Sequence, residues 1–141
     1  GGHMSMATYM ALALEGNTSL DYWATLITGR GLLFVRDDLL GLCKFAGVTA
    51  DHAVEGLKQE IGFEVTSAEL LAAVRRAFVR ALWLERKQGY DRSDYTLPSE
   101  VFDRPNPNLV VPPFVTREFF AQLSDRVWAV FDREIDEMAK S

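Results

Sequence analysis

The side chains best suited to chemistry lie in residues 38–43, whose sequence is D-L-L-G-L-C. Cys43 is the single cysteine of the chain, and a cysteine thiolate can ligate iron. The Asp38 carboxylate can accept two hydrogen bonds from neighbouring N–H donors. Gly41 lets the backbone either approach a flat group closely or turn with a positive φ. Residues 38–43 are therefore the candidate site.

Composition excludes several classes of protein. One cysteine excludes an internal disulfide, and one cysteine with two histidines excludes a Cys-rich structural zinc site. The 141 residues suit a single domain with its own core, and an apolar fraction of 48% excludes intrinsic disorder. Lys and Arg total 15 against 20 Asp and Glu, and the resulting net charge of −5 argues against a general nucleic-acid binder.

The first residues set the expected limits of the domain. Gly1 to Met4 resemble the remnant of an expression tag, so we expect one domain over residues 5–141. The apolar stretch Met6–Leu14 is shorter than the ~20 residues that a membrane span needs. No Lys or Arg precedes it as in a signal peptide. We therefore expect a soluble, cytoplasmic protein without a membrane partner.

One long helix is predicted over residues 67–88, and the other helices would pack against it. Its apolar residues recur every three or four positions and so share one face. These residues are Leu70, Leu71, Val74, Phe78, Ala81 and Leu82. Thr66 and Glu69 can form a capping box at the start, and Gly89 is a natural stop. Such a helix spans about 33 Å.

Shorter helices are expected before it. The same spacing favours helices over residues 20–28 and 32–45, separated by a break at Gly29-Arg30-Gly31. A further helix includes residues 53–61, and Gly62 can close its last turn. The candidate site would then lie within the second half of the 32–45 helix.

A last helix is expected after Thr116, which can cap it. Its apolar face comprises Phe119, Phe120, Leu123, Val127, Val130, Phe131 and Ile135. No segment alternates polar and apolar residues as a half-buried strand does. The fold class is therefore predicted to be all-α, a compact multi-helix domain. Trp23, Trp83 and Trp128 are expected to be core or domain-interface anchors.

Residues 90–115 form a long segment without periodicity. All five prolines lie between Pro98 and Pro113. We expect a proline-rich strap that lies over the helices before the last one, rather than a loop that forms a site by itself. The residues expected to hold the strap in place are Tyr95, Leu97, Val101 and Phe102.

The run at residues 38–43 resembles the D-x-x-G-L-C motif of the tungsten-containing aldehyde:ferredoxin oxidoreductase family, which lies in the C-terminal helical domain of those enzymes. Two downstream blocks support the resemblance. Residues 64–70 resemble the family's Thr-x-x-Glu-Leu helix start, and residues 84–98 resemble its R-E-G-F-x-R-x-D-D-x-L-P stretch. The blocks follow in family order and cover roughly residues 20–105.

The resemblance implies a role for each residue of the motif. In the family, two such motifs hold the two pterins of a tungsten bis-pterin cofactor, and this one also gives a cysteine to a 4Fe-4S iron-sulfur cluster. It implies that Asp38, Gly41 and the Leu42 backbone bind a pterin and that Cys43 is a metal ligand. The parent enzyme would oxidise an aldehyde to a carboxylate at tungsten or molybdenum, with electron transfer through the cluster to ferredoxin.

Much of such an enzyme is missing from this sequence. A 4Fe-4S cluster takes four thiolates, and the chain has one. In the family, an upstream Cys-x-x-Cys-x-x-x-Cys run supplies the other three, and the second pterin motif is upstream too. We therefore expect no cofactor in the isolated chain and no activity from it. As partners we expect the remaining domains, or a catalytic subunit that supplies the three cysteines and the second motif.

Two alternatives remain open. The chain can be a C-terminal domain or subunit of such an oxidoreductase, or a stand-alone, metal-free helical interaction module that kept the fold and lost the chemistry. Departures from the family pattern at Lys87-Gln88 and at Asp94-Tyr95 motivate the second. A domain that closes over a cofactor should expose an apolar patch near residues 41–45.

Two other groups of polar residues could suggest chemistry. His52 is expected to be a surface or capping residue, because no motif position of the family transfers to it. Asp91, Arg92 and Asp94 are expected to form a local ion-pair and turn arrangement rather than an acid/base pair.

Overall fold

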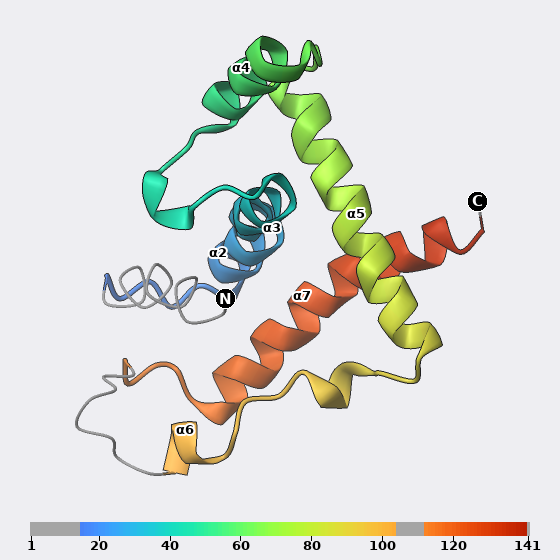
Figure 1. Cartoon of the computed structure of the whole chain (residues 1–141). Helices are drawn as coiled ribbons and strands as arrows, with labels where there is room; N and C mark the ends of the chain where they lie inside the picture. The colour runs from blue at the N-terminus through green and yellow to red at the C-terminus, as the bar shows by residue number, and fades with distance from the viewer. Residues whose placement is uncertain (1–14, 104–111, 141) are drawn as a thin grey trace.

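Helices make up the regular structure of the residues that the computed structural model describes, which are 15–103 and 112–140 (Figure 1). The α-helices are α2 (Leu20–Thr25), α3 (Gly31–Leu40), α4 (Ala50–Ile61), α5 (Ser67–Lys87), α6 (Glu100–Asp103) and α7 (Arg117–Met138). The other elements are a π-helix, η1 (Leu26–Arg30), and two 3-10 helices, η2 (Lys44–Ala46) and η3 (Arg92–Asp94). None of the described residues is in a strand, so the predicted all-α class is confirmed.

Three long helical rods define the architecture. α5 and α7 cross each other, and the rod formed by α2, η1 and α3 lies in the angle between them (Figure 1). α2 contacts α7, α3 contacts α5, and α4 packs on the first half of α5. The candidate site, residues 38–43, spans the end of α3 and the start of the loop that leads to α4.

The apolar residues gather where the rods meet. One cluster of buried residues joins α3, α4 and α5 and contains Leu32, Ala53, Leu70 and Val74. A second joins α5 to α7 and contains Val79, Leu82, Phe131 and Ile135. A third joins α2 to α7 through Trp23 and Leu123. The three predicted tryptophan anchors belong to these clusters, with Trp23 buried and Trp83 and Trp128 half-buried.

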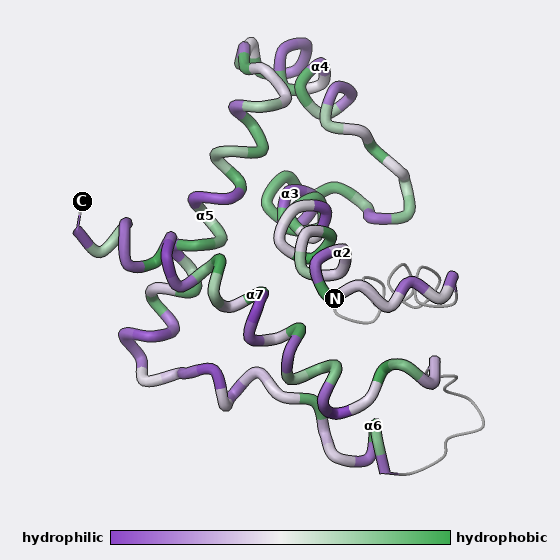
Figure 2. Tube along the Cα trace, turned by 180° about the vertical axis from the view of Figure 1, so that it is seen from behind, coloured by the Kyte–Doolittle hydropathy of each residue, from purple (hydrophilic) through white to green (hydrophobic). Residues whose placement is uncertain are grey.

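Hydropathy along the rods fits this packing. Figure 2 shows hydrophobic and hydrophilic residues following one another at short intervals along α5 and α7. This pattern is typical of helices with one face in the core and one in water. Among the residues described, no helix has the length and apolar character needed to cross a bilayer.

The long helix α5 begins and ends as predicted. The Thr66 hydroxyl accepts a hydrogen bond from the Glu69 N–H, and the Glu69 carboxylate accepts one from the Thr66 N–H. This capping box satisfies two helix-end donors at once. The Thr66 N–H, and after it the hydroxyl, lower the pKa of Glu69 because both hydrogen bonds favour the ionised carboxylate. Gly89, with φ of 95°, ends the helix.

The expected break at Gly29-Arg30-Gly31 was wrong. The helix continues through these residues as the π-helix η1, and Gly31 keeps the right-handed conformation with φ of −56°. Glycine costs only about 1 kcal/mol in a helix interior, which neighbouring contacts can offset. One such contact is the Arg75 guanidinium, which donates to the Thr28 carbonyl at 2.9 Å.

The expected helix over residues 32–45 also proved too long. α3 ends at Leu40, because Gly41 adopts the left-handed conformation with φ of 66°. The Leu42 N–H donates to the Asp37 carbonyl at 2.7 Å, and the Gly41 N–H donates to the Asp38 carbonyl. These two bonds form a Schellman motif, which terminates the helix. Cys43 therefore lies in a loop and not on a helix.

The segment before α7 contacts that helix through aromatic rings. Tyr95 packs on Trp128 with ring centroids 4.9 Å apart, and Phe102 packs on Phe120 at 6.0 Å. Leu97 and Val101, the other residues expected to hold the strap, are half-buried. Residues 104–111 of the expected strap, and residues 1–14 with the expected tag remnant, lie outside the described residues.

Tyr95 provides a test of this attachment. Burial raises the pKa of Tyr95 to about 12, and the hydrogen bond that its hydroxyl donates to Glu85, with the charge of that carboxylate, adds to the rise. The folded chain therefore holds the Tyr95 proton more tightly than the unfolded chain does. This difference stabilises the folded state fully below pH ~10, and the stabilisation is lost as pH rises through about 12. We expect Glu85→Gln to lower the pKa of Tyr95.

Phenolate absorbance during an alkaline titration measures this change, with a Tyr95→Phe titration subtracted to isolate the Tyr95 signal. Glu55→Gln on α4 removes a carboxylate that bonds to Gln59, and it is the matched control. Identical Tyr95 curves for Glu85→Gln and the parent chain would contradict the contact.

Candidate functional site

The end of α3 places Asp38 at the surface. About 65% of its side chain is exposed, and its carboxylate accepts bonds from the Lys44 ammonium at 2.9 and 3.0 Å. Lys44 in turn lies over the Phe34 ring, 5.9 Å from the centroid. The predicted hydrogen-bond acceptor is therefore already occupied by a lysine of the same loop.

The Asp38–Lys44 pair has a backbone cause. Six residues apart on a continuous helix would place the two side chains on different faces, because each residue turns the helix by about 100°. The turn at Gly41 reverses the chain and brings Lys44 back to Asp38. A helix that continued to Phe45 would keep these side chains apart, so the pair was not predicted.

Gly41 is required by its conformation and not by lack of space. A Cβ added at Gly41 would meet no atom within 4 Å, but φ of 66° is a conformation that side chains rarely adopt. Of the two roles that the sequence left open, the structure shows the turn. The Leu42 N–H is used within this turn, so only the Leu42 carbonyl is left to bind a further group.

Cys43 is exposed, and its thiol forms no disulfide. The residue has extended backbone angles and directly precedes η2, and its carbonyl accepts from the Ala46 N–H at 2.9 Å. The short 3-10 turn thus fixes the backbone on one side of the thiol, and the Schellman motif fixes it on the other. The arrangement presents a single thiol to solvent on a fixed loop.

A buried ion pair lies beneath this loop. Arg36 and Asp37 are 2% and 7% exposed, and the Arg36 guanidinium donates to the Asp37 carboxylate at 2.5 and 2.8 Å. It also donates to the Val48 carbonyl at 2.6 Å. Since the Asp37 carbonyl accepts from Leu42, these two residues hold both ends of the loop that carries Cys43.

The Arg36–Asp37 pair was not predicted from the sequence. Leu32, Arg36 and Leu40 are spaced four residues apart, so the arginine occupies a position on an otherwise apolar helix face. A charged residue between two apolar ones at that spacing was the available signal. The remaining Arg36 donor, Nη1, is buried without a hydrogen-bond partner.

The apolar patch expected near residues 41–45 is present in part. Phe45 is 78% exposed and Leu39 is 57% exposed, on either side of Cys43 along the chain. Leu42 instead packs against the cluster of α3, α4 and α5. The candidate site therefore consists of an exposed thiol and an exposed carboxylate, with two exposed apolar side chains nearby in sequence.

Cys43 and Asp38 could supply part of a cofactor site, namely one iron ligand and one hydrogen-bond acceptor. An exposed thiol can reach iron that another polypeptide holds, and one thiolate is a quarter of a 4Fe-4S ligand set. Within residues 15–103 and 112–140, no group of three or more His, Cys, Asp or Glu side chains lies close enough to hold a metal ion. Cys43 is thus a single candidate iron ligand, and the other ligands of such a cluster would have to come from another polypeptide.

The other polar groups have local roles. His52 is exposed in the first turn of α4, where its N–H donates to the Thr49 hydroxyl, so it belongs to a helix cap as expected. Asp91 accepts from the Ser93 hydroxyl and N–H, which lower the pKa of its carboxyl. Asp94 accepts from the Asp91 N–H. Asp91 and Asp94 thus form the predicted turn. Arg92, however, pairs with Asp132 of α7 and not with these two neighbours, so the predicted local ion pair was wrong.

Comparisons with protein-family models, with curated proteins and with solved structures found no match to this chain. The family resemblance rests on the sequence blocks at residues 38–43, 64–70 and 84–98.

Proposed function

We propose that this chain is the cofactor-facing C-terminal domain or subunit of an aldehyde:ferredoxin oxidoreductase-like enzyme, inactive without the polypeptide that completes the site. One observation carries the proposal: the only cysteine is exposed at the end of a D-x-x-G-L-C motif whose loop is fixed at both ends. A cysteine whose role is to pack in the hydrophobic core would be buried, as most free cysteines are.

Each residue of the motif has a task in this proposal. Cys43 ligates one iron of a 4Fe-4S cluster whose other thiolates come from the partner. Gly41 sets the turn that aims the loop, and Leu42 offers its carbonyl. Asp38 accepts hydrogen bonds from a pterin edge once Lys44 moves aside or shares the carboxylate. Phe45 and Leu39 exclude water when the partner covers them.

When bound in the complete enzyme, a tungsten or molybdenum bis-pterin would supply the two-electron oxidation of an aldehyde with water to a carboxylate and three protons, and the cluster would accept the electrons for ferredoxin. This chain carries the hydrogen-bond acceptor Asp38 at the end of α3 and the ligand Cys43 in the loop that follows, on either side of the turn at Gly41. Such an arrangement shortens the electron path from metal centre to cluster.

A second candidate is a metal-free helical interaction module. The observation that favours it is the Asp38–Lys44 pair, because it occupies the carboxylate that a pterin would need. In this candidate the exposed Phe45 and Leu39 bind a partner protein and Cys43 has no ligand role.

Iron content separates the two candidates. We expect the chain, co-expressed with the polypeptide that carries the Cys-x-x-Cys-x-x-x-Cys run, to purify as a complex with about four irons. We expect Cys43→Ala to lose most of this iron and the cluster's electron paramagnetic resonance signal while the two chains still co-purify. His52→Ala, a change to an exposed side chain without an assigned role, should keep full iron.

Full iron in Cys43→Ala would contradict the ligand assignment. A stable complex without iron, unchanged by Cys43→Ala, would instead support the interaction module.

A further inference from the structure

Two hollows adjoin on one face of α5. The larger, about 810 Å³, lies between α5 and the end of α7, and the smaller, about 430 Å³, lies between α5 and the η1–α3 part of the first rod. Ala72 and Arg75 line both, so the hollows form one groove along α5. The groove shares no residue with the Cys43 site.

Small and apolar side chains form much of the groove. Along α5 it follows residues 71–80, which rise about 14 Å and span two to three helical turns. The apolar and small lining residues are Gly29, Leu32, Leu33, Leu71, Ala72, Ala77, Val79 and Met138. Ala72 and Ala77 leave room above the helix backbone where longer side chains would stand. A groove of this shape suits the apolar face of another helix.

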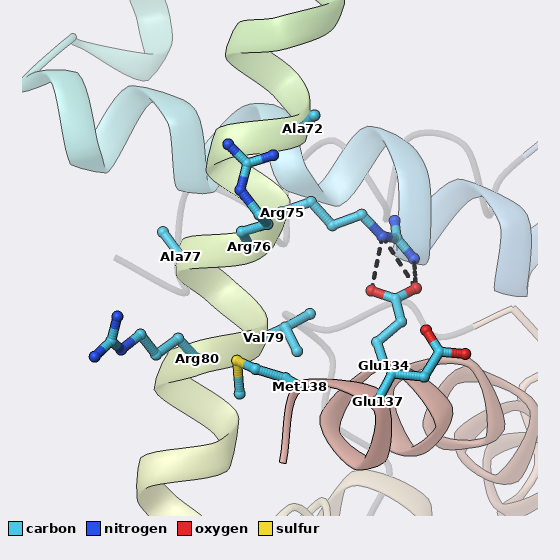
Figure 3. A pocket seen from close by; sticks show the side chains of 9 residues that line it. All are labelled: Ala72, Arg75, Arg76, Ala77, Val79, Arg80, Glu134, Glu137 and Met138. Atoms are coloured by element: carbon cyan, nitrogen blue, oxygen red, sulfur yellow. Dashed lines mark hydrogen bonds and ion pairs between the residues drawn. The ribbon is translucent and has the colours of Figure 1, made fainter. Parts of the chain in front are cut away.

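The cations of the groove are unevenly paired. Arg75 reaches across to Glu134 of α7 and donates to its carboxylate, as Figure 3 shows. Arg76 and Arg80 point away from that pair (Figure 3). No carboxylate of the described residues pairs with Arg76, Arg80 or Arg30, and all three are exposed.

The balance of charge favours an acidic occupant. With Arg75 and Glu134 neutralising each other, the groove has three cations, Arg30, Arg76 and Arg80, against one carboxylate, Glu137. The chain as a whole has a net charge of −5, so this excess of positive charge is local. Complementary charge of this kind selects a partner and speeds its association.

The directions of Arg76 and Arg80 favour an acidic helix over a small anion as the ligand of the groove. A phosphate or carboxylate ligand needs donors that converge on one point. In Figure 3 the Arg76 and Arg80 guanidinium groups extend in different directions from α5. Acidic groups that are spread out, as on a helix one turn apart, meet both arginines in these directions.

We infer that the groove over α5 and α7 binds an acidic amphipathic helix of a partner protein. The apolar face of that helix fills the space above Ala72, Ala77 and Met138. Glu or Asp residues one turn apart on its edge pair with Arg76 and Arg80. This surface acts independently of iron and of Cys43.

Two synthetic peptides test the inference. One is a labelled five-turn amphipathic helix with Leu on one face and Glu along both edges, and the other has Lys in place of every Glu. Fluorescence anisotropy should show the acidic peptide binding and the basic one not. The double variant Arg76→Glu/Arg80→Glu should weaken acidic-peptide binding by about tenfold or more and gain binding of the basic peptide.

Arg133→Glu is the matched control, because Arg133 is an exposed arginine of α7 that does not line the groove, and it should bind as the parent chain does. Equal binding of both peptides, no binding of either, or acidic-peptide binding unaffected by the double variant would overturn the inference. Analytical ultracentrifugation tests whether a second copy of this chain occupies the groove instead. A dimer of the parent chain that dissociates in the double variant would assign the groove to that second copy and overturn the inference.

Discussion

Replacing Asp37 with alanine is expected to lower the free energy of unfolding by about 3–5 kcal/mol. Asp37 is the carboxylate partner of Arg36, and both are almost wholly buried. The substitution leaves a guanidinium in the core without its counter-ion, and one donor of that group already has no partner. Because a domain of this kind is stable by only about 5–15 kcal/mol, this change removes a large share of its free energy of unfolding. Urea denaturation followed by circular dichroism measures the change.

Asp38→Ala is the matched control, since it makes the same chemical change one residue later. Asp38 is mostly exposed, so the loss of its pair with Lys44 should cost no more than about 1 kcal/mol. The double variant Arg36→Met/Asp37→Leu removes both charges and should recover much of the loss. Equal costs for Asp37→Ala and Asp38→Ala would show that the buried pair does not govern stability.

Phe131→Ala is expected to be as damaging, at about 3–5 kcal/mol. Phe131 is 5% exposed and lies at the crossing of α5 and α7, where its ring meets Phe78 edge to face at 5.3 Å. Arg75 lies over the same ring. The alanine variant removes the aromatic contact and leaves a cavity between the two helices. Differential scanning calorimetry and urea denaturation both report the loss.

Phe45→Ala deletes the same side chain at the candidate site and is the control for Phe131→Ala. Because Phe45 is largely exposed, its removal should change stability by less than about 0.5 kcal/mol. A cost for Phe45→Ala equal to that for Phe131→Ala would mean that the loop after α3 is part of the core. That result would argue against a surface held ready for a partner.

The parts of the fold that depend on local chemistry could be predicted from the sequence. α5 and α7 have apolar residues at helical spacing and a threonine at the N-cap, and both signals lie within a few residues of each other. Gly62 and Gly89 end their helices at positive φ, as expected of glycines at those places. Local signals of this kind do not require knowledge of what the helix packs against.

Tertiary contacts decided the parts that were predicted wrongly. At Gly31 the chain stays helical, while at Gly41 the same residue type ends the helix. Propensity alone does not distinguish the two positions. The Arg75 donor to Thr28 supports the first segment, and it comes from a residue 47 positions away. No pattern within the segment itself could reveal that partner.

That Asp38 and Cys43 form a site stays a prediction, and the structure adds the geometry of these residues. Cys43 and Asp38 are exposed, as a site that meets a partner requires. The pairing of Asp38 with Lys44 and the anchor at Arg36 depend on the turn at Gly41, which the longer expected helix concealed.

The division of the core into three clusters has a consequence for how the molecule unfolds. Phe78 packs against both the α3–α4–α5 cluster and the α5–α7 cluster, and Val127 packs against both the α5–α7 and the α2–α7 clusters. Cooperativity between the clusters therefore passes through side chains that are only half-buried. Such a molecule can open one crossing at a time, so amide protection should differ between the rods instead of being uniform.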